Sequence, residues 1–97
     1  MQQNNIVHRF FQHYKNGQIY FVMSISRHSE TEEDLVNYIQ CYESKEYPFG
    51  YMWSRPLKMF LEKIDSEHNR FIRLERKEVE SIIGKLISFL YDNKVNI

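Results

Sequence analysis

Two short segments hold most of the side chains in this 97-residue sequence that could do chemistry. Residues 27–31 read Arg-His-Ser-Glu-Thr, and residues 53–60 read Trp-Ser-Arg-Pro-Leu-Lys-Met-Phe. Each segment lies at the end of a strand-like run, where loops gather and functional side chains concentrate. Histidine beside serine or glutamate can transfer protons or activate a nucleophile. Arginine beside tryptophan suits an anionic or planar ligand.

We interpret these segments as a binding site, because no catalytic motif accompanies them. The sequence contains no glycine-rich phosphate loop and no nucleophile elbow. Neighbours on a strand, such as His28 and Ser29, also point to opposite faces. We therefore predict no catalytic residue, and a ligand-binding set of His28, Glu30, Tyr38, Trp53 and Arg55. One alternative is a small hydrolase or transferase that uses His28 and Glu30. Another is single-stranded nucleic-acid binding on exposed aromatic side chains, namely Tyr47, Phe49 and Tyr51.

The same residues could instead serve only the fold. Arg55 and Glu30 could form a salt bridge that locks the sheet, with Trp53 in the core. His28 could bond a backbone carbonyl group within its turn. Ser29 and Thr31 are residue types that commonly cap a turn with their hydroxyl groups. The sequence leaves this structural interpretation open beside the binding site.

Five short strand-like runs must position these residues. The clearest is residues 19–26, whose alternation places apolar side chains on both faces, so that each face needs a cover. The others are residues 9–14, 35–42, 51–55 and 70–74. Asn16-Gly17 is a strong signal for a hairpin turn, because both residues tolerate a positive φ. Short strands with tight turns predict a small antiparallel barrel.

The last quarter of the chain changes to a helical period. Apolar side chains recur at steps of three and four at Val79, Ile82, Ile83, Leu86, Ile87 and Leu90. This pattern predicts an amphipathic helix over residues 77–93. We expect its apolar stripe to cover one face of the longest strand, formed by Ile19, Phe21, Met23 and Ile25. The alternative is a homodimer in which two such stripes meet. The opposite face, with small Ser24 and Ser26, would then look into the barrel and leave room for a ligand.

Composition narrows the class of protein. Hydrophobic residues make up 42% of the chain and aromatic residues 15%, while alanine is absent, which favours a sheet-rich globular domain. Basic and acidic residues each number 13, and this balance argues against binding to duplex nucleic acid. The single cysteine, Cys41, and the lack of a long apolar stretch predict a cytoplasmic protein without a membrane span. His28, Glu30 and a distant His13 are too few for a metal site, and we expect no cofactor.

Several blocks of the sequence match a known family. They are His13-Tyr14-Lys15-x-Gly17, Tyr20, His28-Ser29-Glu30-Thr31, Val36-x-Tyr38, Tyr42 and Trp53-x-Arg55-Pro56-Leu57-x-Met59-Phe60-x-Glu62. Through them, residues 10 to about 74 resemble DUF1653, a bacterial domain family of unknown function. The resemblance implies a small SH3-like β-barrel and carries no reaction, cofactor or partner. Phe21 stands where the family usually has an acidic residue, and the chain continues into a helix where many members end. Both departures favour a helix that covers the face of Phe21.

The expected architecture is thus mainly β with a C-terminal helix. We predict an N-terminal tail (residues 1–9), a five-stranded antiparallel barrel (10–75) and an amphipathic helix (76–97) packed on the barrel or on a second chain. The expected function is that of a non-enzymatic binding module. Its mouth of aromatic side chains and Arg55 would recognise a small anionic or planar ligand, a nucleotide or a peptide.

Overall fold

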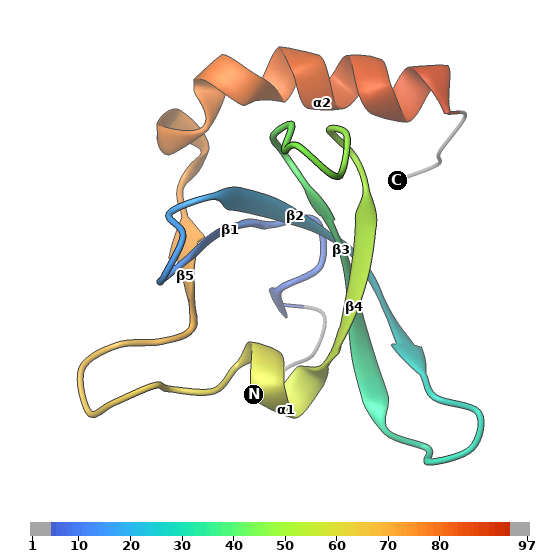
Figure 1. The fold of residues 1–97 in the computed structure, drawn as a ribbon, viewed down its shortest axis with the longest axis vertical. Coiled ribbons are helices and arrows are strands. Elements are labelled where there is room, and N and C mark those ends of the chain that lie inside the picture. Colours follow the sequence, from blue (N-terminus) through green and yellow to red (C-terminus); the bar gives the residue numbers. More distant parts are fainter. Residues whose placement is uncertain (1–4, 94–97) are drawn as a thin grey trace.

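Five antiparallel strands form one sheet in the order β4-β3-β2-β1-β5 (Figure 1). The computed structural model describes residues 5–93. Its strands are β1 (Phe10–His13), β2 (Ile19–Arg27), β3 (Asp34–Gln40), β4 (Met52–Pro56) and β5 (Phe71–Leu74). Its helical elements are α1 (Leu57–Phe60), the 3-10 turn η2 (Arg76–Glu78) and α2 (Glu80–Asp92). The predicted class, mainly β with a C-terminal helix, is confirmed. The outer parts of the expected tail and helix, residues 1–4 and 94–97, lie outside the described residues.

The strand pairing leaves β4 and β5 at opposite edges of the sheet. Between them the chain passes through α1 and a long loop, which Figure 1 shows below the sheet. An isolated bridge between Lys63 and Asn69 closes this loop on itself. No ladder joins β4 to β5 within residues 5–93, so closure into an SH3-like barrel stays a prediction from the family resemblance.

A β-bulge in β2 changes which side chains share a face. In the ladder with β3, Val22 pairs with Tyr38 but Ser24 pairs with Asn37, so Met23 is the extra residue. A bulge inserts one residue and shifts the alternation beyond it. Ile25 therefore joins the cluster on the opposite face from the one we expected. Strict alternation from residue 19 to residue 26 was the wrong assumption.

Ser24 and Ser26 are accordingly exposed and do not leave room inside the domain. The side-chain amide of Asn37 donates to the Oγ atoms of Ser24 and Ser26 at 3.1 and 3.0 Å. Its Oδ1 atom accepts from the Oγ of Ser54 at 2.6 Å. These bonds make a polar stripe across three strands on the solvent side of the bulge.

Two hydrophobic clusters cover the two faces of the sheet. The first contains the buried residues Ile6, Phe11, Tyr20, Val22, Val36, Tyr38, Phe60 and Phe71. Ile6, which we expected in a free tail, is 2% exposed. The second contains Phe21, Ile39, Cys41, Leu86 and Leu90, with Ile19 and Met23 packed against it. The helix α2 thus packs its stripe on the sheet of its own chain (Figure 1).

Gly84 and Gly17 are two glycines whose replacement by alanine should change the stability of the protein in opposite directions. Gly84 lies within α2, where an added Cβ would meet no atom within 4 Å. Because glycine costs a helix interior backbone entropy, we expect Gly84→Ala to raise the unfolding free energy by about 0.5–1 kcal/mol. Gly17 is equally uncrowded but has a φ of +69°, which alanine adopts only with strain. Gly17→Ala should therefore lower the unfolding free energy by about 1–2 kcal/mol. Urea denaturation followed by circular dichroism measures both, and effects of equal sign would contradict this assignment.

Candidate functional site

Three of the five predicted site residues line one hollow. Tyr38 on β3 pairs directly with Trp53 on β4, and Arg55 follows Trp53 by two positions on the same face of that strand. The hollow has a volume of about 200 Å³. Its other lining residues are His13, Asn16, Tyr20 and Phe71. We call these seven residues the Arg55 hollow.

His28 and Glu30 lie elsewhere, in the turn between β2 and β3. The Nδ1 atom of His28 accepts the backbone N–H groups of Glu30 and Thr31 at 3.1 and 3.3 Å. The His28 ring therefore organises the turn, although through N–H groups and not through the carbonyl that we considered. Glu30 is exposed and forms its side-chain hydrogen bond with Ser29. Of the predicted set, these two residues stay outside the Arg55 hollow.

The aromatic side chains considered for nucleic-acid stacking pack against one another and against α2, although Tyr51 is still 42% exposed. The rings of Tyr47 and Tyr51 contact each other at a centroid distance of 4.4 Å, and both contact Trp53. Phe49 is half-buried against Phe89 of α2. Tyr47 and Tyr51 thus pack beside Trp53, and Phe49 packs beside α2.

Sequence reasoning missed His13, Asn16 and Phe71 as site residues. The β1–β5 ladder pairs His13 with Phe71, which is 58 positions later in the chain. Asn16 enters through the β1–β2 turn and donates from Nδ2 to the Oη of Tyr20 at 3.2 Å. The Asn16-Gly17 turn was visible in the sequence, but no local pattern could show what β5 would bring beside it.

Arg55 is the charged centre of this hollow. Its guanidinium carbon lies 5.5 Å from the centroid of the Phe71 ring, a cation–π arrangement. Neither Glu30 nor any other carboxylate lies within 4 Å of the guanidinium in the part of the chain from residue 5 to residue 93. The salt-bridge interpretation therefore fails for Glu30. Arg55 is half-buried beside aromatic rings and donates a hydrogen bond to the hydroxyl of Tyr38.

Hydrogen bonds hold the aromatic walls in place. The indole Nε1 of Trp53 donates to Oε1 of Gln40 at 3.0 Å, and Gln40 is 1% exposed. The hydroxyl groups of Tyr20 and Tyr42 share a hydrogen bond of 2.8 Å. Because these partners are buried or half-buried, the bonds fix the positions of the Trp53 and Tyr20 rings.

The Arg55 hollow carries a positive charge. Burial lowers the pKa of His13, and the positive charges of Arg55, Arg70 and Lys15 lower it further. Its Nδ1 atom accepts the backbone N–H of Lys15 at 3.0 Å, so the neutral ring carries its proton on Nε2. Burial raises the pKa of Tyr38, an effect that nearby Arg55 partly offsets. At neutral pH the hollow thus combines one cation with neutral donors.

Between residues 5 and 93, no three side chains of histidine, cysteine, aspartate or glutamate come together as metal ligands. No helix in this range is long and apolar enough to cross a membrane.

Comparisons with known proteins give a family. A search of curated proteins found no significant match. The chain is similar to a crystal structure of a DUF1653 protein from Bordetella bronchiseptica, with 26% identity and a TM-score of 0.61. The match covers 75% of this chain and 92% of that one. The family model for the protein of unknown function DUF1653 matches residues 9–76, the whole sheet that carries the Arg55 hollow. The chain therefore belongs to the DUF1653 family, as its sequence blocks predicted.

Proposed function

We propose that this protein is a binding module that holds a small planar carboxylate in the Arg55 hollow. The observation that carries the proposal is the half-buried Arg55 guanidinium, which stacks near Phe71 without a carboxylate within 4 Å among residues 5–93. A guanidinium in this state can bind a carboxylate or phosphate through paired N–H donors. The rigid rings of Trp53 and Tyr38 offer flat surfaces to a planar body.

The size of the hollow limits the ligand. Pockets for drug-sized molecules have volumes of about 300–1,000 Å³, and the Arg55 hollow has about 200 Å³. One aromatic ring with a single anionic group suits this space better than a whole nucleotide. A peptide could still place one such side chain or its terminal carboxylate there.

Tryptophan fluorescence can measure ligand binding in the Arg55 hollow, because Trp53 is the only tryptophan in the chain. We expect benzoate to change Trp53 fluorescence saturably, while benzamide, its uncharged isostere, has at least tenfold weaker binding. Arg55→Gln should weaken benzoate binding at least tenfold, and Arg27→Gln should leave it within twofold. Arg27 is the matched control because its exposed side chain pairs with Asp34 away from the hollow.

Further outcomes test the proposal. Native mass spectrometry of the protein from its own host should show a bound small anion that is lost in Arg55→Gln. Equal binding of benzoate and benzamide, or no saturable response to benzoate at millimolar concentration, contradicts carboxylate recognition. An Arg55→Gln chain that unfolds would assign Arg55 to the fold instead, and the urea midpoint of each variant distinguishes these cases.

A further inference from the structure

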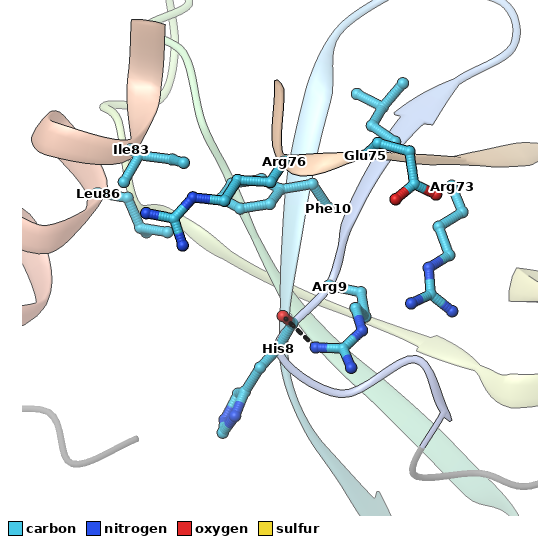
Figure 2. A pocket seen from close by; sticks show the side chains of 9 residues that line it. His8, Arg9, Phe10, Arg73, Glu75, Arg76, Ile83 and Leu86 are labelled. Atoms are coloured by element: carbon cyan, nitrogen blue, oxygen red, sulfur yellow. Dashed lines mark hydrogen bonds between the residues drawn. The ribbon is translucent and has the colours of Figure 1, made fainter. Parts of the chain in front are cut away.

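A second, larger hollow lies where α2 crosses the end of the β1–β5 ladder (Figure 2). Its volume is about 400 Å³, within the range of pockets that hold cofactors and metabolites. Three arginines from separate elements line it, namely Arg9 before β1, Arg73 on β5 and Arg76 in η2. We call it the Arg76 hollow.

These arginines have little competition from acidic groups. Between residues 5 and 93, no carboxylate lies within 4 Å of the Arg9, Arg73 or Arg76 guanidinium. Arg9 donates to the carbonyl of His8, and Arg73 to that of Asn5, both at 3.4 Å. A guanidinium has five N–H donors, so each of these contacts leaves most donors available.

One acidic residue, Glu75, lines the hollow. Its carboxylate lies on the Arg73 side of the opening (Figure 2), and it accepts the backbone N–H of Glu78 in a capping box. Arg76 extends instead toward Leu86 and Ile83 in the same view. Arg76 is therefore the arginine best placed to meet an anion above the apolar part of the hollow.

The floor of the Arg76 hollow is apolar. Phe10 and Leu74 contribute from the paired strands, and Ile83 and Leu86 from α2. Leu86 is 4% exposed. The family model ends at residue 76, so the α2 wall is an addition outside the matched domain. Arginines around an apolar floor suit a ligand that has an anionic end and an apolar or planar body.

We propose that the Arg76 hollow binds a small phosphorylated molecule, with the phosphate on Arg76 and the planar body against Phe10 and Ile83. Arginine pairs with phosphate through two parallel N–H···O bonds, which gives both strength and direction. This site goes beyond the carboxylate site of the Arg55 hollow and has no side chain in common with it.

Titration calorimetry with adenosine monophosphate, adenosine and inorganic phosphate tests the proposal on the full chain. We expect adenosine monophosphate to bind, and Arg76→Gln to weaken it at least tenfold. Lys77→Gln, the same charge change one residue further along, should stay within twofold because Lys77 does not line the hollow. Ile83→Ala should weaken the nucleotide several-fold and leave any phosphate binding unchanged.

The contradicting outcomes are equally specific. Equal losses in Arg76→Gln and Lys77→Gln would show attraction by diffuse charge and overturn the site, as would saturable binding of adenosine alone with the same affinity. No heat from any probe at millimolar concentration also overturns it. Arg55→Gln separates the two proposals, because it should abolish benzoate binding and leave adenosine monophosphate binding intact.

Discussion

Replacing Phe60 with alanine is expected to lower the free energy of unfolding by about 3–5 kcal/mol, the cost typical of a deleted core phenylalanine. Phe60 is 1% exposed and stacks on Phe71 with a centroid distance of 4.2 Å and an interplanar angle of 9°. It also makes edge contacts with Phe11 and Tyr38, at 5.2 and 5.4 Å. Urea denaturation measures the loss. Because small domains are stable by only about 5–15 kcal/mol, this loss is a large fraction of the total free energy of unfolding.

Met59→Ala is the matched control, because Met59 precedes Phe60 in α1 but is 44% exposed. We expect a change within about 0.5 kcal/mol, as for surface positions generally. Met59 therefore lies outside the core, whereas its neighbour Phe60 lies inside it. A single helical turn presents only part of its circumference to the sheet, so one of two neighbours faces solvent. Equal losses in the two variants would contradict the packing.

Leu86→Asp should release α2 from the sheet and lower the unfolding free energy by at least about 3 kcal/mol. Leu86 is 4% exposed and packs with Phe21, Ile39 and Cys41. The substitution loses that apolar burial and places a charged carboxylate against the apolar side chains of this cluster. Ile87→Asp introduces the same charge one residue later, where the side chain is 60% exposed. There we expect a change within about 0.5 kcal/mol.

The thiol of Cys41 provides a direct readout of α2 docking. Cys41 is 5% exposed beneath α2, and burial raises the pKa of its thiol to about 12. At pH 8 the thiol is therefore neutral and covered, and it should react slowly with a thiol reagent. In Leu86→Asp the thiol reaches water and its pKa returns toward about 8.5. We expect its reaction rate to rise at least about 100-fold, with no change in Ile87→Asp. A folded Leu86→Asp protein with a protected thiol would show that α2 is not the cover.

Local sequence preferences were enough to predict the elements of this protein. Alternating apolar side chains marked the strands, Asn16-Gly17 marked the first hairpin, and the change to a period of 3.6 marked α2. These signals are readable because each depends on residues within a few positions of one another. Cys41 as a buried residue on the face of Ile39 follows from the same alternation.

The candidate sites were less predictable, because they depend on pairing between distant segments. The sequence named Tyr38, Trp53 and Arg55, which share one face of the β3–β4 ladder. It also named His28 and Glu30, whose turn extends beyond the end of that ladder. His28 and Glu30 are therefore separated from Tyr38, Trp53 and Arg55 by the length of the β2–β3 hairpin and not by their residue types.

The sequence by itself determined the strands, the helix, the family and the aromatic–arginine wall, because these arise from local periodicity and from blocks of neighbouring residues. Only the tertiary structure decided three other features. The bulge at Met23 moved Ile25 to the other face, the β1–β5 ladder brought Phe71 beside His13, and α2 completed the Arg76 hollow. Each of these features depends on burial and pairing between residues that are far apart in the chain. The sequence of any single segment therefore does not determine its stability.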